Sequence, residues 1–378
     1  MIRVILLAVC LWSSQSFGDE FVDAQTAAKE GRYRDVVDIL TQALTDPELE
    51  LKWKTVAYSN RGIAYSLLDA YALADKDLLQ AISLDPNHVL SLNQLGLLAE
   101  RVKKDDKLAA SFYQRAANLQ YAGSMVNLAA LYREGRGGVS KSPSTAFTLL
   151  LRAAKAGYPN AYGPLGVMYA KGEGTDPNAK EAFTYFQKGA EYGIAAAYYR
   201  LGLAYERGRG TKVNLAEALR NYRLAAVQGH GEAQSALGYL YKRGRGTTKD
   251  LDEAANWYQL AADQGVASAN NRLAWLLATC PIQRLCNGEK AVQLALRALE
   301  ISKEEANNLD LKDNFDRSES SLSSMQDTLA AAYARNGQFD LAIETMKDLL
   351  SSTGGKSGQY SVFKKRLTTY EKGNAYQL

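Results

Sequence analysis

A ten-residue stretch, LGLAYERGRG at residues 201–210, recurs along the middle of the chain with little change. The other copies are LAALYREGRG at 128–137, LGVMYAKGEG at 165–174 and LGYLYKRGRG at 237–246. Successive copies begin 37, 36 and 36 positions apart. So regular a spacing indicates an internal repeat, and repeat periods of about 20–50 residues are typical of solenoid proteins.

A second segment with its own landmarks follows each copy. Alanines, aromatic residues and a closing glycine recur in it with the same period of 36 residues. The alanines are Ala146, Ala182, Ala218 and Ala254, the aromatic residues are Tyr185-Phe186, Tyr222 and Trp257-Tyr258, and the closing glycines are Gly157, Gly193, Gly229 and Gly265. The repeating unit therefore has two halves.

The spacing inside a unit predicts two antiparallel helices. Leu165, Gly166 and Tyr169 fall at positions i, i+1 and i+4, which lie on one face of a helix. The two glycines after each tyrosine indicate the end of that helix, because glycine adopts positive φ angles readily. Ala182 belongs to the inner face of the second helix, and Gly193 ends it. One hairpin cannot bury its own apolar stripe, so we expect the hairpins to stack into an all-α solenoid.

This pattern resembles the Sel1-like repeat family. Its hallmarks are a leucine–glycine pair, a tyrosine, a Gly-x-Gly turn, and then an alanine, an aromatic residue and an Ala-Ala pair. The resemblance covers four units within residues 122–266, and the first unit departs from it by Ala129 and by one extra residue. It implies a right-handed α-solenoid, a superhelix of stacked helical hairpins.

The flanking segments resemble the related tetratricopeptide repeat (TPR). In residues 19–121 the family's landmarks occur in order, as Gly62, Tyr65, Ala74, Ala81 and Pro86, and a following unit contains Leu95-Gly96, Ala109, Tyr113 and Ala116. Residues 267–378 contain Leu273-Ala274-Trp275 in phase with the central repeats, a last hairpin around Tyr333, and a closing helix around Tyr370. We therefore expect TPR-like repeats on both sides and a capping helix at the end.

The charge of the chain is nearly balanced, with 45 Lys and Arg against 41 Asp and Glu. A net charge of +4 is too small to indicate a nucleic-acid-binding protein. Residues 122–266, however, contain 18 Lys and Arg against 12 Asp and Glu, and many of these cations lie around the Gly-x-Gly turns. Stacking is expected to align the turns into a basic rim. This rim either attracts an anionic partner, such as an envelope polymer or an acidic protein, or is simply a solvated edge with cations near helix C-termini.

The N-terminal residues 1–18 have the pattern of a signal peptide. A positive start is followed by the apolar run Val4–Trp12 and by small residues, so cleavage is expected after Gly18. The product would be periplasmic or secreted, with no transmembrane helix in the mature chain. The alternative is an N-terminal helix that is retained. In an oxidising compartment Cys280 and Cys286 either form a small disulfide loop or remain as two thiols.

Residues that could carry catalysis are scarce. The two histidines, His88 and His230, lie in turns without cysteine or carboxylate clusters at metal-ligand spacing, so we expect no metal and no cofactor. Gly354–Gly358 resembles a phosphate-binding loop, but Leu350 occupies the position of its first required glycine. The sequence therefore favours a protein without catalysis of its own.

The resemblance also indicates which residues face the groove of the solenoid. In such arrays the first helix of each hairpin lines the concave surface. The corresponding positions are Asn60, Asn93, Asn127, Lys171, Tyr199, Arg200, Arg207, Tyr239, Lys242, Arg243 and Asn271. Asparagine side chains can donate to and accept from an extended peptide backbone, but they are also simply tolerated on a polar helix face.

The function expected from these features is that of a scaffold or adaptor in the bacterial cell envelope, which binds segments of other proteins. One alternative is a scaffold associated with polysaccharide or peptidoglycan. Another is the β-lactam hydrolysis linked with cysteine-rich Sel1-like relatives, but those contain a cysteine pair in nearly every repeat. The four central units contain no cysteine, which argues against an enzyme of that kind.

Overall fold

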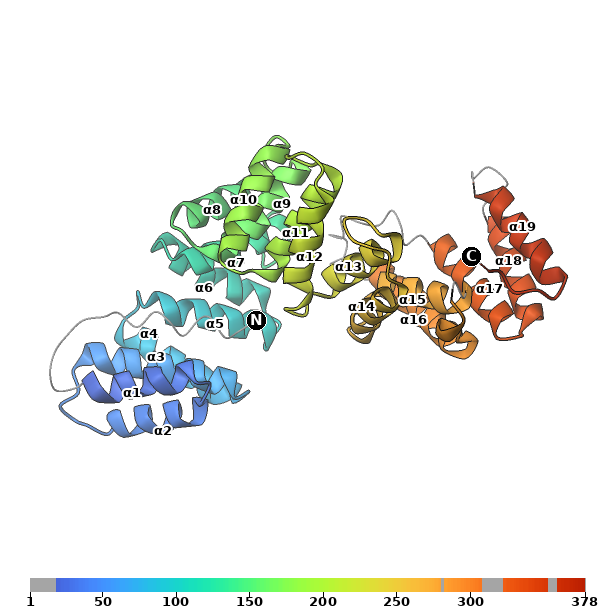
Figure 1. Cartoon of the computed structure of the whole chain (residues 1–378). Coiled ribbons are helices and arrows are strands. Elements are labelled where there is room, and N and C mark those ends of the chain that lie inside the picture. The colour runs from blue at the N-terminus through green and yellow to red at the C-terminus, as the bar shows by residue number, and fades with distance from the viewer. Residues whose placement is uncertain (1–17, 280–281, 308–321, 353–358, 378) are drawn as a thin grey trace. The chain divides into compact units, whose positions relative to one another are not determined.

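The structure is a computed structural model that describes residues 18–279, 282–307, 322–352 and 359–377. All regular structure in these ranges is helical (Figure 1), which confirms the all-α prediction. The chain divides into two compact units, residues 1–185 and 186–378, and the boundary falls within helix α10 (Ala179–Glu191). The predicted signal peptide lies outside the described residues, except for Gly18, where α1 begins.

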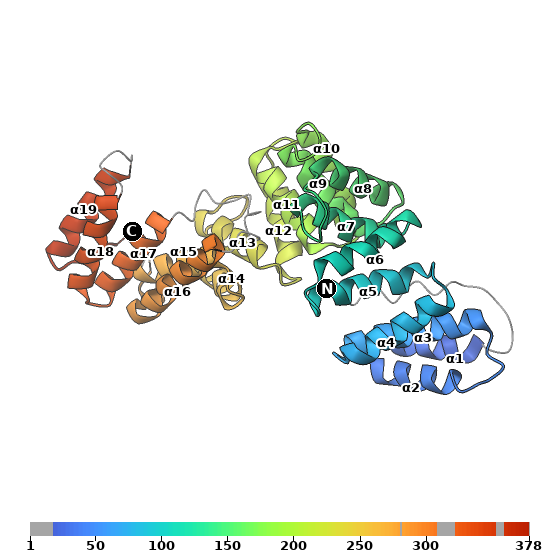
Figure 2. The same cartoon turned by 180° about the vertical axis from the view of Figure 1, so that it is seen from behind.

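Unit 1 is built of helical pairs that follow one another along the chain. Consecutive helices pack side by side, as the view from behind also shows for α3, α4 and α5 (Figure 2). The helices are α1 (Gly18–Lys29), α2 (Tyr33–Ala43), α3 (Leu51–Leu67), α4 (Tyr71–Leu84), α5 (Val89–Arg101), α6 (Asp106–Asn118), α7 (Ala122–Glu134), α8 (Pro143–Lys155), the short 3-10 helix η2 (Pro159–Ala161) and α9 (Tyr162–Lys171).

Unit 2 has the same organisation and continues to the last described helix. Here α15 contacts both α16 and α17, so the first helices of successive hairpins are neighbours. The helices are α11 (Ala195–Arg207), α12 (Leu215–Ala226), α13 (Gly231–Arg243), α14 (Leu251–Asp263), α15 (Ala267–Thr279), the 3-10 helix η3 (Gln283–Leu285), α16 (Gly288–Asn307), α17 (Leu322–Arg335), α18 (Phe339–Ser352) and α19 (Tyr360–Glu371).

The glycines of the repeat act as the sequence predicts. A Cβ atom on Gly202 of α11 would lie 2.5 Å from the ring of Tyr222 on α12, so the missing side chain lets the two helices of one hairpin approach closely. Gly208 ends α11 in the left-handed conformation, with φ of +68°. A Cβ on Gly246 would lie 2.5 Å from the backbone oxygen of Leu215, so that turn packs directly on the preceding hairpin.

The second helix of each unit begins with a polar residue that caps it. The backbone N–H of the capping residue donates to the carbonyl oxygen of the repeat tyrosine, for example from Asn214 to Tyr205 at 2.9 Å. The side chain of Asn214 accepts from the N–H of Glu217 and so satisfies a free donor of the first turn. The capping residues, which recur every 36 positions, are Ser142, Asn178, Asn214 and Asp250.

The core runs between the helices of successive hairpins. The alanines at 146, 182, 218 and 254 are 0–3% exposed, and Tyr113, Tyr222 and Tyr258 are fully buried. Within each unit the buried residues form several apolar clusters between neighbouring helices, as expected for hairpins that bury their faces by stacking.

Candidate functional site

The inner helices of unit 2 line an open pocket of about 360 Å³, here called the inner pocket. The first helices of three successive hairpins, α13, α15 and α17, form its walls together with α19. It is lined by Tyr239, Lys242, Arg243, Tyr258, Ser268, Asn271, Arg272, Trp275, Ser324, Asp327, Thr328, Gln359 and Arg366. Its size lies in the range of small ligand pockets, about 300–1,000 Å³.

One side of the inner pocket is strongly cationic. Lys242 and Arg243 end α13, and Arg272 of α15 donates to the backbone oxygen of Ser235 at 3.2 Å and to its hydroxyl at 3.0 Å. The guanidinium groups of Arg243 and Arg272 lie 5.9 and 5.4 Å from the ring centre of Tyr239. These contacts hold the two arginines in place at the rim of the pocket.

Lys242 is partly buried and forms no ion pair with any other residue that the structure describes. Burial, and after it the positive charges of Arg243, Arg272 and Lys249, together lower the pKa of Lys242 from its ordinary value of 10.5 to about 8. In the folded protein, desolvation and repulsion by the neighbouring cations therefore both destabilise the charged form of Lys242. An anion bound in the pocket would attract the ammonium group and so offset both penalties.

The opposite side contains a buried ion pair. Arg366 of α19 donates from Nη1 to Oδ2 of Asp327 on α17, and its guanidinium lies 4.6 Å from the ring centre of Trp275 and 4.8 Å from that of Tyr376. Oδ1 of Asp327, Nε of Arg366 and Oδ1 of Asn271 are buried without a hydrogen-bond partner in the described structure. Such atoms carry a desolvation cost, about 1–3 kcal/mol each.

The pocket brings together four of the eleven residues that the sequence placed in the groove: Tyr239, Lys242, Arg243 and Asn271. The asparagines of unit 1 have a different arrangement. Oδ1 of Asn93 accepts from Oγ of Ser124 at 2.9 Å and from Nδ2 of Asn127 at 3.0 Å, and so links α5 to α7. Part of their hydrogen-bonding capacity is therefore used between repeats. Their role toward a peptide stays a prediction.

The other predicted groove residues lie outside the inner pocket. The ring of Tyr199 stacks on His230 with 4.8 Å between ring centres, and the guanidinium of Arg200 lies 5.9 Å from the Tyr199 ring. Lys171 ends α9 and pairs with Glu173 at 3.4 Å. Arg207 is exposed at the end of α11, and Asn60 is half-buried on α3.

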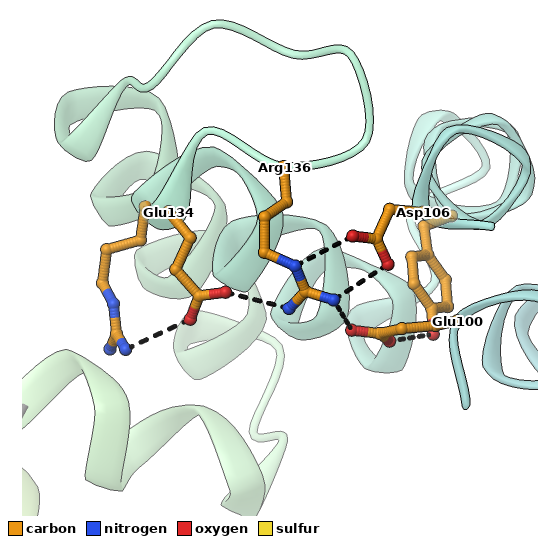
Figure 3. Close-up of polar contacts among 6 residues, drawn as sticks. Glu100, Asp106, Glu134 and Arg136 are labelled. Carbon is orange, nitrogen blue, oxygen red and sulfur yellow. Dashed lines mark hydrogen bonds and ion pairs between the residues drawn. The ribbon is translucent and has the colours of Figure 1, made fainter. Parts of the chain in front are cut away.

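The basic rim is partly used for contacts between repeats. Figure 3 shows the guanidinium of Arg136, from a Gly-x-Gly turn, among three carboxylates. It bonds Asp106 at 2.8 Å, Glu134 at 2.9 Å and Glu100 at 3.4 Å, and Glu100 also accepts from the Tyr113 hydroxyl at 3.0 Å. This arginine therefore ties one repeat to the preceding one.

The same link recurs in unit 2. Arg245 donates to Oε1 of Glu206 at 2.7 Å, while Oε2 of Glu206 accepts from the buried Tyr222 hydroxyl at 2.8 Å. Burial and the neighbouring carboxylate raise the pKa of Tyr222 well above its ordinary value. Two of the cations that the sequence assigned to the rim, Arg136 and Arg245, thus contribute to the stacking of repeats.

The two histidines cap helices. The ring nitrogen Nδ1 of His88 accepts from the N–H of Ser91 at 3.4 Å, and that of His230 accepts from the N–H of Ala233 at 3.3 Å. Burial lowers the pKa of both rings, which keeps the accepting neutral form. No group of three or more His, Cys, Asp or Glu residues that could hold a metal ion occurs among the described residues. Cys280 lies outside them, so its bridge to Cys286 stays a prediction.

Several pocket residues were not identified from the sequence: Arg272, Trp275, Asp327 and Arg366. Asn271 precedes Leu273 by two positions, and Asp327 precedes Leu329 by the same two positions. The same offset from the repeat leucine therefore points to Asp327. No comparable sequence signal exists for Arg366, because α19 lies outside the repeat.

The sequence pattern of the Sel1 repeat family matches five segments of the chain: residues 90–121, 122–158, 161–193, 195–230 and 231–266. The chain therefore contains five Sel1 repeats. The last four Sel1 repeats are the units found in the sequence, and the first covers residues that resembled a TPR. The remaining flanks are compatible with TPR-like hairpins. Sel1 repeats form a general protein-interaction scaffold.

Solved structures agree with this assignment. A Sel1 repeat protein from Oxalobacter formigenes is 28% identical, with a TM-score of 0.55 over 64% of this chain and 96% of that chain. The protein c5321, a protective antigen present in uropathogenic Escherichia coli strains and displaying an SLR fold, is 21% identical. Its TM-score is 0.63 over 93% of this chain and 75% of that chain, which shows a shared fold. No curated protein sequence matches significantly.

In the part of the chain that the structure describes, no helix is both long enough and apolar enough to cross a membrane.

Proposed function

We propose that this Sel1-repeat protein is a non-catalytic scaffold of the bacterial cell envelope that binds segments of other proteins along the first helices of its hairpins. The inner pocket is the observation that carries the proposal. It is formed by residues of α13, α15, α17 and α19, and it contains buried polar atoms without partners in the described structure. A bound protein segment would supply those partners.

The signal-peptide pattern of residues 1–18 supports the envelope location. The Sel1 family supports protein partners, since its repeats form a protein-interaction scaffold. The scarcity of histidine and cysteine supports a role without catalysis, because many nucleophile and base pairs use these side chains.

The test is affinity capture from an envelope extract after chemical crosslinking. The bait is the full chain in three forms: wild type, the groove variant Arg207→Glu plus Arg243→Glu, and the control variant Arg220→Glu plus Lys347→Glu. The control makes the same charge change on exposed positions of α12 and α18, which are second helices. Wild type and control are expected to capture one principal partner that the groove variant loses.

Equal capture of that partner by all three forms would refute binding along the inner helices. Circular dichroism of each form confirms that the helical content is unchanged. A fractionation experiment tests the location: the mature chain should appear in the periplasmic or secreted fraction without residues 1–18, and its recovery from the cytosol with those residues intact would contradict the proposal.

A further inference from the structure

The charge of the inner pocket differs from that of the corresponding place in two other repeats. Glu100 and Glu206 occupy one equivalent position of their repeats, and each accepts a hydrogen bond from the tyrosine on the second helix of the same hairpin. Lys242 lies 36 residues after Glu206, at the same position of the next repeat. Lys242 therefore places a cation where those two repeats have a carboxylate, and the pocket opens beside it.

The lining of the inner pocket contains four cationic side chains and one acidic side chain. Arg366 pairs with the acid, Asp327, at the far wall. Lys242, Arg243 and Arg272 lie on the near wall, along α13 and α15. Lys242 has no ion-pair partner among the described residues, although it is partly buried. The near wall is thus suited to an anion.

Two acceptors complete the arrangement. Asn271 and Asp327 are each only 7% exposed, line the pocket, and have one oxygen without a hydrogen-bond donor in the described structure. They come from equivalent positions of neighbouring first helices, α15 and α17. A ligand that fits must therefore offer N–H or O–H donors to these oxygens and negative charge to the near wall.

We propose that the inner pocket binds an acidic segment of a partner protein, whose carboxylates contact Lys242, Arg243 and Arg272 and whose backbone N–H groups donate to Asn271 and Asp327. This inference rests on the proposed scaffold function and names the chemistry of the partner. An extended peptide supplies both kinds of group at short spacing, since carboxylate side chains alternate with backbone donors along it.

The aromatic residues of the pocket favour a peptide over a sugar. Saccharide rings bind on open aromatic faces, but cations already occupy the aromatic rings here. Arg243 and Arg272 lie near Tyr239, and Arg366 lies 4.6 Å from the ring centre of Trp275. Arg243 and Arg272 line the pocket beside the Tyr239 ring, and such cations suit carboxylates.

The test uses fluorescently labelled short peptides and the full chain at low salt. One peptide alternates Glu and Ser, a second has Gln in place of Glu, and a third has Lys. Fluorescence anisotropy should show binding of the Glu peptide at least about tenfold tighter than of the Gln peptide, with no binding of the Lys peptide. A tenfold change is the size expected for a hydrogen bond to a charged group.

Variants then locate the binding site. Lys242→Met is expected to weaken binding of the Glu peptide about tenfold or more, whereas Lys242→Arg keeps the charge and stays close to wild type. The matched control is Arg220→Met, which removes one positive charge from an arginine whose side chain is 70% exposed on α12. It should leave the affinity unchanged.

The inference is overturned if wild type does not distinguish the Glu peptide from the Gln peptide, or if Lys242→Met binds the Glu peptide as tightly as wild type. The scaffold function would still be supported after such a result if wild type captures an envelope partner that the groove variant loses. Conversely, selective peptide binding without any captured partner would support the pocket and contradict the scaffold.

Discussion

Replacing Lys242 by methionine should stabilise the protein at neutral pH. The pKa of this ammonium is lowered from 10.5 to about 8 because it is partly buried beside other cations. One pKa unit corresponds to about 1.4 kcal/mol, so the desolvated charge costs at most about 3 kcal/mol. Because Lys242 keeps some contact with solvent, we expect about 1–2 kcal/mol from its removal. Methionine retains the length and the apolar stem.

The pH dependence of this gain identifies its cause. The pKa of Lys242 is lower in the folded state than in the unfolded chain. Between about pH 8 and pH 10.5 the unfolded chain therefore binds this proton more tightly. The penalty in the wild type is therefore fully present below about pH 8 and disappears as the pH rises through 10.5. The advantage of Lys242→Met should be largest at pH 7 and absent near pH 11.

Thermal unfolding followed by circular dichroism measures the effect. For a folded unit of about 150–250 residues, 1 kcal/mol corresponds to about 2–4 °C, so a gain of about 1–2 kcal/mol should raise the midpoint by about 2–8 °C at pH 7. Arg220→Met provides the control and should change the midpoint little, since its side chain is 70% exposed. An unchanged or lower midpoint for Lys242→Met at pH 7 would refute the reasoning, as would a gain of the same size at high pH.

Three further predictions follow from the repeats and the pocket. Gly202→Ala should destabilise the protein by about 1–3 kcal/mol in urea unfolding, because the new Cβ would lie 2.5 Å from the Tyr222 ring; an unchanged midpoint would contradict the close approach. Glu206→Ala should cost about 2–3 kcal/mol by leaving the buried Tyr222 hydroxyl without its acceptor, and Glu206→Gln should cost less, so equal losses would refute this account. Binding of the Glu peptide should weaken as the pH rises past about 8 in the wild type but not in Lys242→Arg, and a parallel decline in both would exclude Lys242 as the titrating group.

The local rules of the repeat were readable in the sequence because they depend on neighbouring residues. Gly208 ends a helix because its backbone adopts a φ of +68°. A glycine at that position predicts the turn from the sequence without knowledge of any tertiary contact. The period of 36 residues places Tyr222 and Tyr258 at equivalent buried positions. Helix order, hairpin pairing and the Sel1 pattern all follow from such short-range regularities.

The inner pocket was only partly predictable. Asn271 and Lys242 were identified through their place in the repeat, but the role of Arg136 was not. The sequence placed Arg136 on a free basic rim, whereas the structure surrounds it with Asp106, Glu134 and Glu100 (Figure 3). Its partners Glu100 and Asp106 are 36 and 30 residues away, and no helical periodicity reports a contact across that distance.

By itself the sequence determined that this chain forms helical hairpins, that glycines end the helices of the central repeats, and that the hairpins must stack to bury their apolar faces. Only the tertiary structure decided which charges meet. Arg366 reaches Asp327 across 39 residues, and Lys242 lies beside the Arg272 side chain of the next hairpin. Those pairings depend on the packing of one hairpin against another, whereas the hairpins themselves depend on the backbone preferences of adjacent residues.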